Sequence, residues 1–401
     1  MFEEYYKNDY SSEYPLSIIN QREFGFLSFE GWMFRHLSFK NDFELEDFLQ
    51  RNVPSDVYCS CAYYEDPVAE MEMKGWLGAD LIFDIDADHI PTSCDRFHDK
   101  WVCSVCGLAG MGITPRKCPV CEGEKFRVSS WPCAVCLESA KMETIKLLEM
   151  LIQDFGFSEK EISVFFSGHR GYHVYVESEE VKALDSMARK EIVDYVLGIG
   201  LDVSYHGLSK RSFRISSSSK NLPLSEFSWR GRLALAMRKF ISNVQREDLE
   251  EIGLARDVVE KILSKKNDIL KKWLEEGTLG AVRGLGEKNW RKIAEHVIGW
   301  QSAKVDTVVT TDIHRLIRLE GTLHGKTGLK KVECPVSEIA DFNPLRSAVA
   351  FKGDAVTVYI SDAPKFRVGE EVFGPYKKRR IELPTAAAIL LICKGRAEVV
   401  R

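Results

Sequence analysis

Residues 165–176 read FFSGHRGYHVYV, a sequence that predicts a β-hairpin with a functional turn. Aromatic and β-branched residues at both ends predict two strands, and the glycines between them predict a tight turn. Glycine lets the backbone approach a ligand closely, and Ser, Arg and His side chains supply donors that suit a triphosphate. A hairpin whose basic residues face water is the alternative. The candidate nucleotide-binding residues of the turn are Ser167, His169, Arg170, Gly171 and His173.

Other strand and helix patterns surround this hairpin. Apolar, β-branched or aromatic runs bounded by turn residues predict strands at 81–88, 355–361 and 387–395. Apolar residues recur every three or four positions in 41–50 and 137–155, which is typical of amphipathic helices. From about 223 to 300 the strand signals give way to charged, helix-periodic sequence. The predicted class is therefore α+β, a mixed α/β core with an inserted helical subdomain.

The bulk composition is that of a globular protein. The chain has 401 residues, of which 45% are hydrophobic and 29% charged. The longest apolar runs are far shorter than the roughly 20 residues that span a bilayer, and the first residues do not resemble a secretory signal. We therefore expect a cytoplasmic, nucleoid-associated enzyme that does not bind membranes. Because the formal net charge is −5, any nucleic-acid contact must come from a local basic surface.

Asp84 and Asp86 are two residues apart in the apolar run LIFDIDAD (81–88), so a strand would place both side chains on one face. Adjacent carboxylates repel unless a cation lies between them, and hard oxygen ligands suit Mg²⁺ or Mn²⁺. Asp88 continues the same face and is a weaker candidate. The alternative is a strand that ends in a solvated acidic turn.

A two-metal site for phosphoryl transfer needs a further acidic ligand from elsewhere in the chain. Asp306 precedes the β-branched run TVVTT and could present its carboxylate from a strand edge. Asp312 precedes IHRLIRL, a predicted helix, where it has the position of an N-cap. Asp306 is therefore the preferred third ligand.

A second basic loop punctuated by glycine reads HGKTGLKK from residue 324. His324 and Lys326 could bind phosphate there, with Arg318 a short distance upstream. The loop does not match GxxxxGK[ST], so the sequence does not support a Walker site.

Six cysteines form three CxxC pairs, Cys103 with Cys106, Cys118 with Cys121, and Cys133 with Cys136. Cytosolic thiols in this arrangement predict zinc, and CSVCG and CPVCEG resemble the knuckles of a zinc ribbon. Either the first two pairs or the last two pairs could bind one structural Zn²⁺. A closed thiolate shell leaves no position for substrate, so we expect the zinc to lie away from the chemistry. The remaining cysteines are expected to be core or incidental residues: Cys59, Cys61, Cys94, Cys334 and Cys393.

Taken in order, these motifs resemble the small catalytic subunit of archaeal and eukaryotic primases. The resemblance rests on KGWLGADLIFDIDAD (74–88), WPCAVCLESAK (131–141), FFSGHRGYHVYV (165–176) and VDTVVTTDIHRLIRLEGTLHGKTGL (305–329), and covers most of the chain except the helical insertion. It implies a core of two β-sheets flanked by helices. The implied domains are a catalytic core in 1–100, 139–222 and 301–401 with C-terminal strands, a zinc module in 101–138 and the helical insertion in 223–300.

The resemblance also implies roles. Asp84, Asp86 and Asp306 match the family's catalytic metal ligands, and Ser167, Arg170 and His173 match residues that contact the incoming triphosphate. The basic positions of the last motif correspond to Arg318, His324 and Lys326. The sequence departs from the family pattern in two places. Residue 169 is His where some members have Arg, and the cysteine module has one pair more than the versions that carry four ligands. The family pattern favours Cys133 and Cys136 as members of the zinc site.

The implied activity is DNA primase, a DNA-directed RNA polymerase that makes short primers by a two-metal mechanism and could also polymerise deoxynucleotides. Its partners would be a DNA template, nucleoside triphosphates and a large primase subunit. A related end-joining polymerase is one alternative, and synthesis of primers without a pre-existing 3′ end would distinguish the two. A non-catalytic zinc-ribbon nucleic-acid-binding protein would not need an acidic pair beside phosphate-binding loops. A metal-dependent nuclease would share the acidic cluster, but it would not explain the two triphosphate-like loops.

Overall fold

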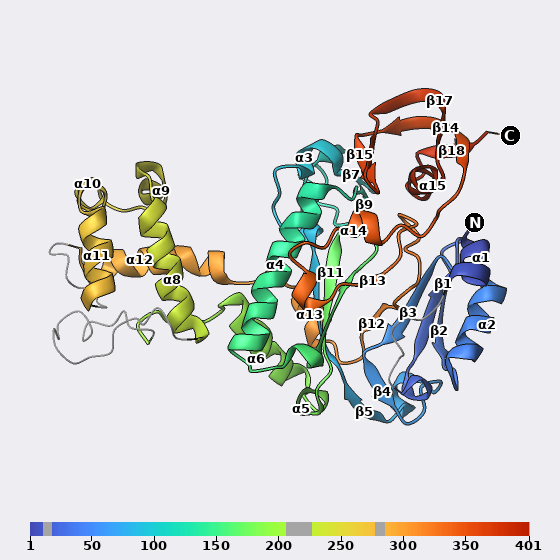
Figure 1. The fold of residues 1–401 in the computed structure, drawn as a ribbon, viewed down its shortest axis with the longest axis horizontal. Coiled ribbons are helices and arrows are strands. Elements are labelled where there is room, and N and C mark those ends of the chain that lie inside the picture. The colour runs from blue at the N-terminus through green and yellow to red at the C-terminus, as the bar shows by residue number, and fades with distance from the viewer. Residues whose placement is uncertain (11–17, 206–226, 277–284, 401) are drawn as a thin grey trace. The chain divides into compact units, whose positions relative to one another are not determined.

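The computed structural model describes residues 1–401 except 11–17, 206–226, 277–284 and 401 (Figure 1). The chain forms two compact units, the first from 1–145, 158–190 and 304–401, and the second from 146–157 and 191–303. The predicted start of the helical insertion, near residue 223, lies outside the described residues. Among the described residues, no helix has both the length and the apolar character needed to cross a membrane.

One sheet of the first unit has the strand order β12-β3-β1-β2. Its strands are β1 (Phe24–Leu27), β2 (Met33–Leu37), β3 (Asp56–Ser60) and β12 (Leu316–Arg318). Helix α2 (Asp42–Asn52) buries Leu45 and Leu49 together with residues of β1 and β3. The Asn41 side chain accepts a hydrogen bond from the Glu44 N–H and caps this helix. The predicted helix at 41–50 is confirmed.

The second sheet has the order β13-β10-β11-β6, and each neighbouring pair is antiparallel. Its strands are β6 (Leu81–Asp86), β10 (Ile162–Phe166), β11 (Gly171–Val176) and β13 (Val332–Glu333). The predicted hairpin is formed by β10 and β11. Helix α4 (Ala134–Gln153) confirms the amphipathic pattern at 137–155. Two sheets with helices beside them confirm the predicted α+β core (Figure 1).

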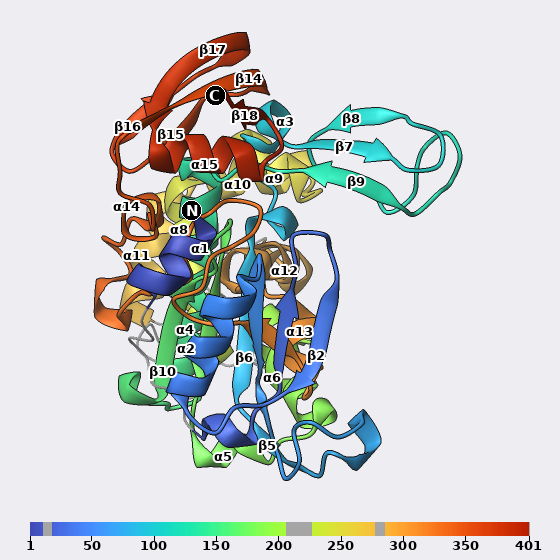
Figure 2. The same cartoon turned by 90° about the vertical axis from the view of Figure 1, so that its right-hand side faces the viewer.

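Smaller elements complete the first unit. Strands β7 (Lys100–Cys103), β8 (Ala109–Met111) and β9 (Phe126–Ser129) form a three-stranded ribbon that projects beside the C-terminal elements (Figure 2). The others are β4 (Ala62–Tyr64), β5 (Trp76–Ala79), α1 (Phe2–Glu4), α3 (Asp95–His98), α5 (Glu179–Lys182) and α14 (Pro344–Ser347).

The C-terminal part contains β14 (Ala355–Ala363), β15 (Phe366–Val368), β16 (Glu371–Phe373), β17 (Tyr376–Pro384), α15 (Thr385–Cys393) and β18 (Ala397–Val399). The predicted strand at 387–395 is wrong, because most of that segment belongs to α15. A short, continuous apolar run has no helical or strand periodicity in its sequence, and here Ala and Leu favour the helix.

The segment after Asp306 also differs from the prediction. TVVTT forms the short helix α13 (Thr307–Thr311), and Asp306 is its N-cap. IHRLIRL is not a helix, since its second half becomes strand β12. Asp312 therefore follows a helix instead of beginning one. Pairing of β12 with β3, a strand from the other end of the sequence, outweighs local helix propensity.

The second unit is helical among its described residues. It includes the end of α4 and most of α6 (Ser186–Leu197). The other helices are α8 (Ser228–Asn243), α9 (Arg246–Glu251), α10 (Arg256–Ser264), α11 (Lys266–Glu276) and α12 (Glu287–Gln301). The helix-periodic sequence from 228 onward forms helices as predicted. The compact unit extends beyond the predicted insertion, because it also includes 146–157 and 191–205.

Candidate active site and metal centres

The pairing of β6 with β11 places the two aspartates beside the SGHRGYH turn. His173 lies opposite Asp84, and Gly171 lies opposite Asp86. Between the aspartates, Ile85 is fully buried. A β-carbon at Gly171 would lie 2.3 Å from the Ile85 carbonyl oxygen, so only glycine allows this close pairing. The sequence thus fixes the acidic pair against the start of β11.

Asp306 reaches the same place from α13. Its N–H donates a hydrogen bond of 2.8 Å to the Asp84 carbonyl oxygen. Its carboxylate accepts hydrogen bonds from the N–H groups of Val308 (2.8 Å) and Val309 (3.3 Å). The alternative ligand, Asp312, lies at the other end of α13, where its carboxylate accepts the His314 N–H.

The electrostatics of the three carboxylates favour a cation. Burial and the neighbouring carboxylates of Asp86 and Asp306 raise the pKa of Asp84 to about 7, and burial also raises the pKa of Asp86. In the described part of the chain, two clusters of metal-binding side chains, both rich in cysteine, have all their ligand atoms within 4.8 Å of one another. The carboxylates of the three aspartates are spaced more widely than that. In charge and donor type, the three carboxylates fit Mg²⁺ or Mn²⁺.

The two predicted basic loops meet beside the acidic residues. The Thr327 hydroxyl donates to the Gly168 carbonyl oxygen at 2.6 Å, and the rings of His169 and His324 stack with centroids 5.0 Å apart. Ser167 accepts the Gly171 N–H at 3.3 Å and so braces the turn from inside. These contacts join two segments that are distant in the sequence.

A pocket opens between the carboxylates and the loops. It is lined by Tyr58, Asp84, Asp86, Ser167, His169, His173, Val309, Arg315, Leu316, Ile317, Arg318 and His324. Arg318 is held there by an ion pair with Asp56 at 2.7 Å and by donation to the Leu323 carbonyl oxygen. Acidic groups and hydrogen-bond donors therefore share one pocket, as binding of a metal–triphosphate requires.

The histidines of the pocket are neutral at pH 7. Burial, reinforced by nearby lysine or arginine charges, lowers the pKa of His169, His173 and His324 well below the usual value. His173 Nε2 lies 3.6 Å from an Asp84 carboxylate oxygen. A neutral imidazole carries one N–H, so each of these rings can donate a single hydrogen bond.

The ribbon carries the first cysteine cluster. Cys103, Cys106, Cys118 and Cys121 place their sulfur atoms within 4.8 Å of one another. Its two CxxC knuckles form the same turn. The Gly107 N–H donates to the Cys103 carbonyl oxygen, and the Glu122 N–H donates to the Cys118 carbonyl oxygen. Backbone N–H groups of Cys106 and Val105 lower the pKa of the Cys103 thiol to about 6. Of the two predicted pairings, the structure shows the ribbon solution.

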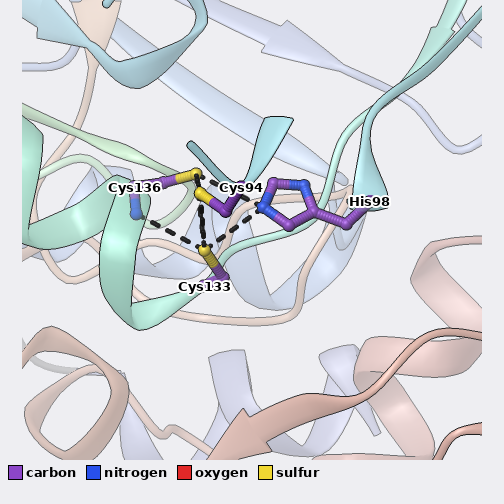
Figure 3. Close-up of side chains that lie close together, drawn as sticks. All are labelled: Cys94, His98, Cys133 and Cys136. Atoms are coloured by element: carbon purple, nitrogen blue, oxygen red, sulfur yellow. Dashed lines mark hydrogen bonds between the residues drawn. The ribbon is translucent and has the colours of Figure 1, made fainter. Parts of the chain in front are cut away.

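A second cluster joins Cys94, His98, Cys133 and Cys136 (Figure 3). His98 Nε2 lies 3.2 Å from the Cys133 sulfur and 3.5 Å from the Cys136 sulfur. His98 Nδ1 lies 2.7 Å from the Asp99 carboxylate, which orients the ring with Nε2 toward the thiols. One His and three Cys in a compact group fit tetrahedral zinc, as do the four thiols of the ribbon.

Known proteins are similar to this chain along nearly its whole length. The model of the DNA primase small subunit matches residues 130–337, more than half of the sequence. The chain is 35% identical to the DNA primase small subunit PriS of Archaeoglobus fulgidus, over 99% of this chain and 96% of the relative. Identity to PriS of Nitrosopumilus maritimus is 32%, with the same two coverages. The chain belongs to the DNA primase small-subunit family.

Arg170 has a different environment in the structure from the one expected. It is 1% exposed and is not among the pocket-lining residues. Its guanidinium pairs with Asp99 at 2.7 Å and with Asp88, the weaker metal-ligand candidate of the sequence. Arg170 Nη1 also lies 3.7 Å from the Cys136 sulfur. The second cluster therefore contacts the SGHRGYH turn through Arg170. That zinc lies away from the chemistry stays a prediction.

Sequence reasoning misses several residues. Cys94 is expected to be a core or incidental residue and His98 is not predicted, although their C-x₃-H spacing before the ribbon is a usable signal. Arg315 lines the pocket without being predicted. Lys394 is also missed: its Nζ lies 3.0 Å from His169 Nε2, and burial together with Arg170 lowers its pKa to about 7. No local pattern marks Lys394, because it follows a helix that is distant from the turn in the sequence.

Proposed function

We propose that this protein is the catalytic subunit of a DNA primase and joins nucleotides on a DNA template with two Mg²⁺ or Mn²⁺ ions held by Asp84, Asp86 and Asp306. The β6–β11 register carries the proposal, because it puts the acidic pair and the SGHRGYH turn in one pocket. Bound at the carboxylates, the cations would lower the pKa of the 3′-hydroxyl and stabilise the pyrophosphate leaving group.

The chain's own donors would hold the triphosphate in line. Ser167 and the neutral rings of His169, His173 and His324 offer hydrogen bonds, and Arg318 offers positive charge from the pocket wall. Lys326 is exposed on the second loop and is not among the pocket-lining residues, so it would have to reach the triphosphate from outside the pocket. The Gly171 backbone allows close approach, and Arg170 positions the turn through its ion pairs. The 3′-oxygen forms a bond to the α-phosphorus as the bond to pyrophosphate breaks, so no covalent enzyme intermediate is needed.

The wider assignment follows from the family. The proposed product is a short RNA primer for DNA replication, with deoxynucleotide polymerisation as a second activity of the same site. Each cysteine cluster would hold one structural Zn²⁺. The protein would work with a large primase subunit, in the cytoplasm near the nucleoid.

A template-dependent synthesis assay tests the proposal. Ribo- and deoxynucleotides are supplied separately, with chelator and after restoration of Mg²⁺, Mn²⁺ or Zn²⁺. Synthesis should return with Mg²⁺ or Mn²⁺ and not with Zn²⁺ alone. Asp84→Asn should lower the rate at least a thousandfold, whereas Asp341→Asn, at an exposed position, should leave it unchanged. Full activity of Asp84→Asn would refute the metal assignment.

A further inference from the structure

A concave feature separate from the proposed catalytic pocket lies between the ribbon and the C-terminal strands. This pocket has a volume of about 530 Å³, which is within the usual range for sites that bind small molecules or single nucleotides. Its walls come from α3, β7, β8 and β9 on one side and from the facing ends of β14 and β17 on the other. Figure 2 shows these elements side by side.

The side chains of this pocket combine positive charge with aromatic rings. Lys100, Lys377 and Arg396 line it, against one carboxylate, that of Asp362. Phe97 also lines it and is 80% exposed, so its ring is available on the surface, and Tyr376 is partly exposed. Stacking rings beside a positive groove are the usual means of holding single-stranded nucleic acid without sequence preference.

Strand β17 continues the positive charge away from the pocket. Its first half contains Lys377, Lys378, Arg379 and Arg380, all exposed, and its only carboxylate is that of Glu382. In the part of the chain that the structure describes, none of these four cations forms an ion pair, although Arg379 lies 5.7 Å from the Tyr376 ring centroid. Charge on an edge strand also blocks pairing between sheets, but that function needs neither a pocket nor an exposed ring.

We propose that the pocket lined by Phe97, Tyr376 and Lys377, together with the basic first half of β17, binds single-stranded nucleic acid and guides the template strand. The phosphates would follow the cations of β17, and a base would stack on Phe97 at the pocket. The inference rests on the proposed function, because a template-directed enzyme needs a path for an unpaired strand. It also explains how a chain of net charge −5 can bind a polyanion, through a local surface.

Binding of a fluorescent oligothymidylate, followed by anisotropy across a range of salt concentrations, tests the site in the full chain. Replacing Lys377 and Arg380 with Gln should weaken binding about tenfold and lower the salt slope by roughly 1.4, since each single-strand phosphate contact contributes about 0.7. Phe97→Ala should weaken binding about fivefold or more while leaving the salt slope unchanged, because base stacking contributes about 1–3 kcal/mol. The matched control, Lys40→Gln with Lys160→Gln, removes two exposed charges elsewhere in the first unit and should change neither quantity.

The same variants separate this site from the proposed catalysis. The protein with Lys377 and Arg380 replaced should need a higher template concentration for half-maximal synthesis at saturating nucleotide. Its KM for nucleotide should stay unchanged. If the wild-type protein makes no product but the variants still lose oligonucleotide binding, the proposed primase function is refuted and the proposed single-strand binding site is supported. Unchanged affinity and salt slope in the variant with Lys377 and Arg380 replaced, or equal losses in the lysine control, would overturn the proposal.

Discussion

Asp84 shows how a single residue can be unfavourable in the fold and useful in the site. It is largely buried in an apolar strand and has two carboxylates nearby, so its pKa rises to about 7. An alternating strand predicts the pair Asp84 and Asp86 because both features are local. No local sequence pattern predicts that Arg170 forms ion pairs with Asp88 and Asp99, because ion pairs between distant segments depend on the tertiary fold.

The stability of the protein without divalent cations should depend on pH through Asp84. A raised pKa means that the folded state binds the proton more tightly, so stability present when Asp84 is protonated is lost as pH rises toward and above 7. Asp84→Asn cannot ionise and should be more stable than wild type by about 1–3 kcal/mol at pH 8, and by less at pH 6.

Urea unfolding at pH 6 and pH 8, without added divalent cations, measures this difference. Added Mg²⁺ should reduce it by stabilising wild type alone. An equal difference at the two pH values would show that Asp84 does not titrate in this range.

Asp99 should act as a positioning residue between the second cluster and the SGHRGYH turn. It contacts His98 and the Arg170 guanidinium together. Asp99→Asn should therefore speed zinc loss from the second cluster by about 10–100-fold and raise the KM for nucleotide. Release into a chromogenic chelator resolves the two zinc ions, and the ribbon zinc is the internal control. Equal acceleration at both sites, or at neither, would count against this role.

At the level of elements, sequence patterns work where residue type or spacing favours one structure and fail where both structures fit. Strands 81–86, 162–166 and 171–176 are predictable from apolar, β-branched or aromatic runs bounded by turn residues, and helices α2 and α4 from helical spacing. The segment 387–395 is not predictable, because a short, continuous apolar run fits either structure. TVVTT and IHRLIRL exchange their predicted structures, since pairing of β12 with β3 decides the second and leaves the first as a single helical turn.

The close pairing of β6 and β11 predicts a severe effect at Gly171. A methyl group there would collide with the Ile85 carbonyl oxygen, so Gly171→Ala should cost about 2–4 kcal/mol and separate the aspartates from the turn. Gly299→Ala is the matched control, because it lies within α12 and has no atom within 4 Å of the added carbon. Ala favours helix, so the control should gain up to about 1 kcal/mol. Chemical denaturation measures both, and a Gly171→Ala protein as stable as wild type would contradict the pairing.

For the molecule as a whole, the motif order predicts which segments make the site, and the fold supplies how they meet. His169 and His324, from loops far apart in the sequence, stack in the structure, as the shared chemistry of the two loops leads us to expect. The metal centres are predicted less completely. The second cluster takes Cys94 and His98 from before the ribbon and Cys133 and Cys136 from after it, so its ligands are interrupted in sequence by the first cluster.

Metal content should reflect this arrangement. We expect two zinc ions for each chain by elemental analysis, against the single zinc that the sequence favours. Cys118→Ser should remove only the ribbon zinc and leave the KM for nucleotide near wild type, whereas Cys136→Ser should remove the other zinc and raise that KM, because it contacts Arg170. One zinc in the wild-type protein, or the same kinetic effect from both variants, would contradict this assignment.

Primer synthesis on an unprimed single-stranded template, with Mg²⁺ or Mn²⁺ and the large subunit present, tests whether the three aspartates support primase activity. Wild type should make short primers without any pre-existing 3′ end. Asp306→Asn should reduce synthesis at least a thousandfold while zinc content and oligonucleotide binding stay at wild-type levels, and Asp312→Asn should retain most of the activity. Product formed only by extension of a supplied 3′ end would indicate a repair-type polymerase, and full activity of Asp306→Asn would contradict the three-aspartate metal site.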